Sequence, residues 1–160
     1  MKNKTLSIIV PAYNEEETIE LFFDEVNAQT VDLPLDKTFY FINDGSSDRT
    51  LDVIKMLSQK HPNVKYISFS RNFGKEAALL AGLRAASGDF VTVMDADLQD
   101  PPSMLKEMYH KIQEGYDIVG TRRISRKDEP FIRSLFARAF YKIMNTISST
   151  KWWMALETIA

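Results

Sequence analysis

Two carboxylates stand two residues apart in VTVMDADLQDPP, residues 91–102, directly after an apolar run. In an extended strand end such side chains point the same way, so Asp95 and Asp97 can reach one object and Gln99 can extend the row. Carboxylates this close repel each other unless a positive charge lies between them. Oxygen ligands suit Mg²⁺ or Mn²⁺ when phosphates and water complete the shell. The spacing therefore predicts a divalent cation that also carries a diphosphate.

The same stretch has a simpler interpretation. An exposed turn, followed by a helix that starts with proline, would also gather acids and prolines in this way. Asp100 fits that alternative best, as a cap for a helix beginning near Pro102. We therefore do not count Asp100 among the metal ligands.

Polar residues also follow two other apolar runs, in PAYNE (11–15) and NDGSSD (43–48). Asp44 could accept a hydrogen bond from a nucleobase, or it could belong to ordinary Asp-Gly turn chemistry. Tyr13 could stack on a base or pack against the protein. Glu15 could bind a ligand or favour the N-terminus of the next helix through its dipole. Each alternative stays open at this point.

The elements that must position these residues alternate along the chain. The first helix is expected to start at Asn14 with Glu17 in a capping box, and the second at Ser46 or Ser47. A third, rich in Ala and Leu, should end at Gly88. A fourth helix is expected between Pro102 and Gly115, and the strands between the helices at residues 6–13, 38–44, 64–70, 89–97 and 117–122.

This alternation predicts an α/β domain with a mainly parallel sheet. The predicted strands are mostly apolar throughout, as strands covered on both faces would be. Because ligands collect beyond the carboxyl ends of parallel strands, the three polar strand ends should face one edge.

Composition limits the remaining possibilities. A chain of 160 residues that is 44% hydrophobic can form one domain with a core, and with no cysteine it has neither disulfides nor thiolate metal sites. We expect no signal peptide, because Pro11 and the acids after it interrupt the N-terminal apolar run, and no membrane-spanning helix, because no apolar stretch reaches the necessary length. The net charge of −2 argues against general nucleic-acid binding. However, eight basic and two acidic side chains between Arg122 and Lys151 give that segment +6, which suggests an anionic partner.

Residues 130–147 contain apolar side chains in two neighbouring columns at four-residue spacing, with Arg133, Arg138 and Lys142 outside them. A basic amphipathic helix of this kind can rest in a membrane interface. It could equally pack on this domain or on a partner subunit.

Five segments together resemble the family 2 glycosyltransferases of the GT-A fold: SIIVPAYNEEETI, FINDGSSDRT, SRNFGKEAALLAGLRAASGD, VMDADLQDPP and VGTRR. They occur in the family's order and cover residues 6 to about 145. DADLQDPP is most similar to the branch that acts on polyprenyl phosphates, which includes dolichol-phosphate mannosyltransferase and the bactoprenol glucosyltransferases.

The resemblance implies a metal-dependent, inverting transfer of a sugar to a polyprenyl (undecaprenyl or dolichyl) phosphate. The donor would be a UDP-sugar by analogy with the bactoprenol branch, with GDP-mannose as the alternative. It implies Mg²⁺ or Mn²⁺ at Asp97 and Gln99 with Asp95 close by, and catalytic roles for Asp97 and Arg122. The resemblance further assigns Arg133 to the acceptor phosphate, and the nucleotide sugar to Pro11, Ala12, Tyr13, Glu15, Ile42, Asp44, Asp95 and Ala96.

The resemblance also suggests a division of the chain. Residues 1–122 would be the nucleotide-sugar-binding GT-A core, 123–147 the basic amphipathic region and 148–160 an atypical tail. Because family members continue further, we expect a chain incomplete on its C-terminal side, and a catalytically inactive nucleotide-sugar-binding fragment is the alternative function. The expected location is cytoplasmic and peripheral at the inner face of the cell membrane, and a homo-oligomer is compatible with the sequence. A phosphoacceptor or phosphatase site at the Asp cluster is a third alternative.

Overall fold

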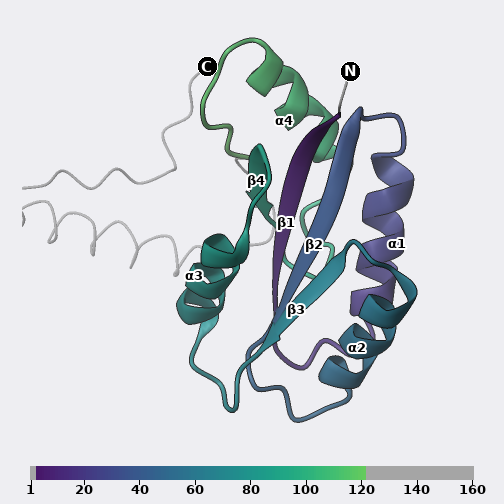
Figure 1. Ribbon diagram of the computed structural model, residues 1–160, viewed down its shortest axis with the longest axis vertical. Coiled ribbons are helices and arrows are strands. Elements are labelled where there is room, and N and C mark those ends of the chain that lie inside the picture. Colours follow the sequence, from purple (N-terminus) through teal and green to yellow (C-terminus); the bar gives the residue numbers. More distant parts are fainter. Residues whose placement is uncertain (1–2, 122–160) are drawn as a thin grey trace, which may run out of the picture. The chain divides into compact units, whose positions relative to one another are not determined.

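The computed structural model describes residues 3–121, which form a parallel sheet with helices on both faces (Figure 1). The strands are β1 (Lys4–Ala12), β2 (Leu35–Asn43), β3 (Val64–Ser68) and β4 (Phe90–Val93). The helices are α1 (Ile19–Gln29), α2 (Thr50–Lys60), α3 (Lys75–Ala85) and α4 (Met104–Gln113). The predicted α/β alternation with parallel strands is confirmed.

The spatial order of the strands is β3-β2-β1-β4. The chain moves outward from β1 through β2 to β3, and then returns to the other side of β1 to form β4, as the ribbon shows (Figure 1). The direction in which strands are added to the sheet therefore reverses between β1 and β4. A reversal of this kind opens a crevice at the carboxyl ends of the two strands.

The two central strands are buried on both faces. Ile8 and Val10 of β1 belong to a cluster that α1, α2 and α4 complete, whereas Ile9 belongs to a second cluster that α3 completes. The edge strands behave differently, because Tyr66 of β3 and Val91 of β4 are exposed. The prediction of strands covered on both faces holds only for the centre of the sheet.

Helix α3 lies unusually close to β1. A Cβ atom added at Gly82 would come within 2.3 Å of the Ile9 side chain, a distance that no real contact allows. Only glycine lets the helix approach the strand this closely. The contact fixes the distance between α3 and β1, and with it the position of Lys75 in the first turn of α3.

The helices begin later than predicted. Thr18 holds the N-cap position of α1 and Arg49 that of α2, not Asn14 and Ser46 or Ser47. The predicted capping residues instead bond across two loops: the backbone N–H of Asn14 donates to Ser46 Oγ at 3.0 Å, and that of Ser47 donates to Asn14 Oδ1 at 2.9 Å. These side chains tie the β1–α1 loop to the β2–α2 loop, so they are not free to cap their own helices.

Two further differences concern the last elements. Residues 117–121 form no strand: no described strand pairs with this segment, and Ile118 is 88% exposed. At the start of α4 the N-cap position belongs to Ser103, not to Asp100, whereas Gly115 follows the helix with a φ of +102°, as expected of a glycine beyond a helix end.

The start of β4 is bonded firmly to β1. Asp89 Oδ2 accepts hydrogen bonds from the backbone N–H of Thr5 at 2.7 Å and from its hydroxyl at 2.8 Å, and Thr5 Oγ1 accepts from the backbone N–H of Asp89. The backbone N–H of Gly88 donates to Ser7 Oγ, and a Cβ on Gly88 would approach the Ser7 backbone to 2.9 Å. Gly88 therefore permits a close strand contact and does not end α3, which is followed by Ala86.

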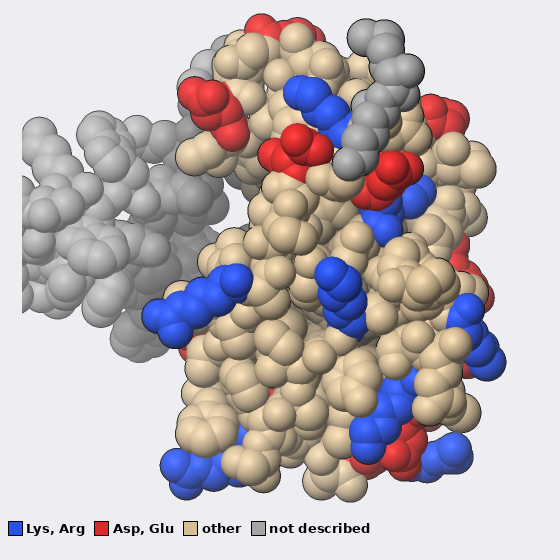
Figure 2. Space-filling view, viewed as in Figure 1, with Lys and Arg blue, Asp and Glu red and all other residues tan. Residues whose placement is uncertain are grey.

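Within residues 3–121 no helix is long and apolar enough to cross a membrane. On the face that Figure 2 displays, acidic and basic side chains are interspersed among neutral surface. The predicted basic segment from Arg122 onward lies outside the described residues.

Candidate active site

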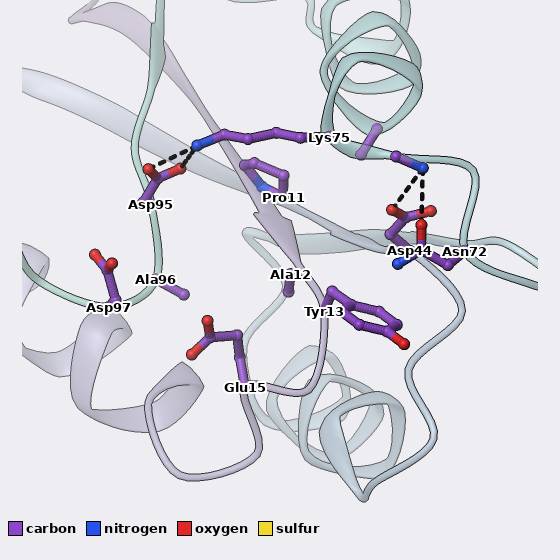
Figure 3. Close-up of a pocket in the computed structure, with 12 residues that line it drawn as sticks. Pro11, Ala12, Tyr13, Glu15, Asp44, Asn72, Lys75, Asp95, Ala96 and Asp97 are labelled. Atoms are coloured by element: carbon purple, nitrogen blue, oxygen red, sulfur yellow. Dashed lines mark hydrogen bonds and ion pairs between the residues drawn. The ribbon is translucent and has the colours of Figure 1, made fainter. Parts of the chain in front are cut away.

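A pocket of about 320 Å³ lies beyond the carboxyl ends of the central strands, at the reversal of strand order. It is formed by the ends of β1, β2 and β4 and by the start of α3 (Figure 3). The residues that line it are Pro11, Ala12, Tyr13, Glu15, Asp44, Asn72, Gly74, Lys75, Ala78, Asp95, Ala96 and Asp97.

Eight of the residues singled out from the sequence meet in this pocket, although they come from three separate segments of the chain. They are Pro11, Ala12, Tyr13, Glu15, Asp44, Asp95, Ala96 and Asp97. Figure 3 shows two ends: Tyr13, Asp44 and Asn72 at one, and Asp95 and Asp97 at the other. The half-exposed ring of Tyr13 leaves an aromatic face available to a flat ligand.

Asp44 is buried and its two oxygens point to the loop before α3. Oδ1 accepts from the backbone N–H of Phe73 at 2.7 Å, and Oδ2 accepts from that of Gly74 at 3.0 Å. Each carboxylate oxygen can accept a second hydrogen bond, so Asp44 can still meet a donor from a ligand. The loop is also packed tightly, because a Cβ on Gly45 would come within 2.2 Å of the Arg71 backbone.

Asp95 holds an ion pair across the pocket. The ammonium group of Lys75 lies 2.7 Å from Oδ1 and 2.7 Å from Oδ2 of this carboxylate (Figure 3). Both side chains are about half exposed. The positive charge that the crowded acids require is therefore supplied, in this structure, by a lysine from another element.

Asp97 lies at a strained turn. Its Oδ1 accepts from the backbone N–H of Gln99 at 3.0 Å, and Leu98 between them has a φ of +57°, which a residue with a side chain rarely adopts. The turn directs Asp97 into the pocket, whereas Gln99 is not among the lining residues.

The donor set can be compared with what a divalent cation needs. Among residues 3–121, no group of three acidic or histidine side chains is arranged as a metal cluster. However, Asp95 and Asp97 open into one pocket, and two carboxylates are a sufficient protein contribution for Mg²⁺ or Mn²⁺ when phosphate and water supply the rest. The residues present therefore fit a cation that arrives together with a diphosphate.

Glu15 and Ile42 differ in what they offer the pocket. Glu15 Oε2 accepts from the Thr18 hydroxyl at 2.7 Å, while its backbone N–H donates to Thr50 Oγ1, so the side chain is held at the pocket wall. Ile42 is fully buried in the cluster beneath α3, and its side chain does not line the pocket. Arg122, Arg133 and helix 130–147 lie outside the described residues.

Sequence reasoning missed four lining residues, two in the loop before α3 and two in its first turn: Asn72, Gly74, Lys75 and Ala78. The available signal was the Asn-Phe-Gly-Lys segment directly before an Ala-rich helix, because glycine at such a place indicates a loop with a positive φ. In the structure the φ of Gly74 is +96°. That segment was interpreted as the start of a helix and as part of one of the five family motifs, and no site residue was assigned to it.

A family model described as Glycosyl transferase family 2 matches residues 7–157. CsbB of Bacillus subtilis (strain 168), a glycosyltransferase by its name, is 48% identical over 145 residues, covering 91% of this chain and 44% of the relative. A bactoprenol glucosyl transferase of Shigella phage SfV is 42% identical over 146 residues, covering 91% of this chain and 48% of the relative. The chain thus spans less than half the length of either relative.

Two solved structures of sugar-transferring enzymes are also similar to this chain. Glucosyl-3-phosphoglycerate synthase from Mycobacterium tuberculosis, solved with Mn²⁺, UDP-glucose and phosphoglyceric acid, has a TM-score of 0.61 and 25% identity, covering 89% of this chain and 50% of that one. Mannosyltransferase PcManGT from Pyrobaculum calidifontis, solved with GDP-Man and Mn²⁺, has a TM-score of 0.51 and 28% identity, covering 61% and 28%.

Proposed function

This chain belongs to glycosyl transferase family 2 and has a GT-A fold, and from that premise we propose its reaction. We propose a metal-dependent, inverting transfer of a sugar from a nucleotide sugar to a polyprenyl phosphate. A UDP-sugar is the favoured donor and GDP-mannose the alternative. Residues 1–122 would form the donor-binding core.

The observation that carries the proposal is the charge of the pocket. Among its described lining residues, four bear carboxylates, namely Glu15, Asp44, Asp95 and Asp97, and one bears a positive charge, Lys75. A nucleoside diphosphate is itself an anion, so this surface would repel it without an additional cation. A divalent ion on Asp95 and Asp97 converts the acidic end into a diphosphate site.

The ends of the pocket suggest how a nucleotide sugar would lie. Tyr13 offers its ring to the base, and Asp44 retains acceptor capacity for a base N–H. Pro11, Ala12 and Ala96 supply backbone and small side chains between the ends, where the ribose would fit. We assign Asp95, Asp97 and Gln99 to the metal, with Gln99 reaching it through a change at the 97–99 turn.

Bond cleavage at the anomeric carbon places negative charge on the departing diphosphate. The bound Mg²⁺ or Mn²⁺ would supply charge stabilisation at that point. We propose that Arg122 assists it there and that Arg133 binds the acceptor phosphate. Since a lipid phosphate is already an anion, the reaction requires no strong general base from this chain.

The polyprenyl phosphate acceptor rests on two observations. One relative is named a bactoprenol glucosyl transferase, and residues 130–147 have the pattern of a basic helix that lies in a membrane interface. We therefore propose a peripheral position at the cytoplasmic face of the cell membrane.

The proposal can be tested in two stages. Calorimetry should show UDP binding that requires Mn²⁺ or Mg²⁺, while GDP under the same conditions decides between the two donor classes. Transfer of radiolabelled glucose from UDP-glucose to a short polyprenyl phosphate then tests catalysis. Metal-dependent binding without transfer would identify the inactive nucleotide-binding fragment, and no nucleotide binding by the folded chain would refute the proposal.

A further inference from the structure

Lys75 is the feature of this pocket that the proposed function does not yet explain. Its ammonium group contacts both oxygens of Asp95, each at 2.7 Å, although the two residues are 20 positions apart and belong to different elements. The contact covers the carboxylate that a divalent cation would need. A divalent ion bound to these oxygens would share them with a second positive charge.

The backbone of Lys75 is held in place by its neighbours. Gly74, immediately before it, donates to the buried Asp44, and α3 is pressed onto β1 at Gly82. The side chain beyond that fixed backbone is 55% exposed. Lysine carries its charge on a flexible four-carbon stem, so the ammonium group can move while the helix does not.

The two positive charges exclude each other at Asp95. Mg²⁺ binds carboxylate oxygen at about 2.1 Å, which would place the ion within a few ångströms of an ammonium group still bound to the same oxygens. Like charges at that separation repel strongly. Entry of the ion therefore requires Lys75 to leave, and a phosphate that enters with the ion offers it a new anionic partner within the same pocket.

We propose that Lys75 is a placeholder cation and a donor-binding residue: it neutralises Asp95 while the pocket is empty and moves to the diphosphate when a divalent ion takes Asp95. This inference rests on the proposed function, because it assumes that metal and nucleotide share the pocket. It adds a phosphate-binding role for the first residue of α3.

The test separates metal binding from nucleotide binding in the full 160-residue chain. Lys75→Gln removes the competing charge, and Lys75→Arg keeps a charge. The matched control is Lys106→Gln, since Lys106 makes a similar two-oxygen ion pair with Asp32, at 2.9 Å and 3.0 Å, but does not line the pocket. Titration with MnCl₂ alone, in which the free ion is detected by electron paramagnetic resonance, gives the metal affinity. Calorimetry with UDP at saturating Mn²⁺ gives the nucleotide affinity.

Removing the ion pair should move the two affinities in opposite directions. Lys75→Gln should bind Mn²⁺ about two- to fivefold more tightly, as expected from loss of a partly exposed competing pair. It should bind UDP on the order of tenfold more weakly, because a charge-assisted contact with phosphate is lost. Lys75→Arg should retain most of the UDP affinity, and Lys106→Gln should match the wild type in both titrations.

Each outcome bears on a distinct claim. If wild type binds Mn²⁺ and UDP but Lys75→Gln behaves like Lys106→Gln, the role of Lys75 is refuted and the proposed function stands. If Lys75→Gln weakens both affinities together, Lys75 does not compete with the metal and the placeholder role fails. If folded wild type binds neither, the proposed function fails and the inference with it. Equal melting temperatures of the variants show that each result concerns binding and not folding.

Discussion

Asp44 connects the base end of the pocket with the loop that leads into Lys75, so Asp44→Asn should have effects beyond a lost charge. The native carboxylate is 4% exposed and accepts from two backbone N–H groups, at 2.7 Å and 3.0 Å. Asparagine keeps one accepting oxygen but turns an NH₂ group toward the other N–H. One hydrogen bond to the charged group is then lost, and two donors face each other. Because the backbone N–H of Gly74 also donates to Asn72 Oδ1 at 3.0 Å, we expect the NH₂ group of the asparagine to face Gly74.

The size of the effect follows from that arrangement. A hydrogen bond to a charged group contributes about 1.5–3 kcal/mol, so we expect the free energy of unfolding to fall by about 2–3 kcal/mol. For a domain of this size the melting temperature should then fall by roughly 10 °C. Calorimetric melting measures the change, with Asp24→Asn on the exposed face of α1 as the control. Hydrogen exchange should also accelerate at the amides of Phe73 and Gly74.

This role of Asp44 would be refuted if Asp44→Asn melted within about 1 °C of Asp24→Asn and the two amides kept their protection. That result would mean that the loop before α3 is held by its packing over Gly45 and not by the carboxylate. The position of Lys75 would then not depend on Asp44.

Three further changes give separate tests. Asp97→Asn should weaken Mn²⁺ binding by about tenfold or more but leave the melting temperature unchanged, because the side chain is exposed and an amide oxygen can still accept from Gln99; equal Mn²⁺ affinity would contradict its assignment. Gly82→Ala should cost about 1–3 kcal/mol in thermal unfolding, since the added methyl would overlap Ile9, and an unchanged melt would mean that α3 can shift at no cost. Hydrogen bonds from Thr5 lower the pKa of Asp89 from its ordinary 3.8. The ionised carboxylate therefore stabilises the fold above that pH, and this contribution is lost as pH falls through the lower folded pKa. The melting temperature of Asp89→Asn should thus depend less on pH below about pH 4, and a pH profile identical to that of the wild type would exclude this contribution.

The family and the layered architecture were predictable because both depend on local patterns. Apolar runs alternating with amphipathic segments lead to parallel βαβ units, and the five motifs identified the family that the comparisons confirm. The meeting of polar strand ends at one edge also follows from parallel strands alone.

What failed depends on partners distant in sequence. Asn14 and Ser46 are good capping residues, yet they bond to each other's loops across more than 30 positions, so the helices start later than local signals suggest. Likewise, nothing near Asp95 indicates that Lys75 will reach it, because the fold of α3 against β1 creates that pair. Local propensity contains no information about such contacts.

The bonding of β4 at its start, through Asp89, Thr5, Gly88 and Ser7, makes this strand mechanically asymmetric. Its register against β1 is secured at the end remote from the pocket, and ladder pairing stops at Val93. A ligand could therefore change the conformation of the segment from Asp95 onward while the register of β4 against β1 stays unchanged. Substitutions of Asp89, Thr5 or Ser7 should then alter how the segment from Asp95 onward responds to a ligand, from about twenty ångströms away, since a strand rises about 3.3 Å per residue.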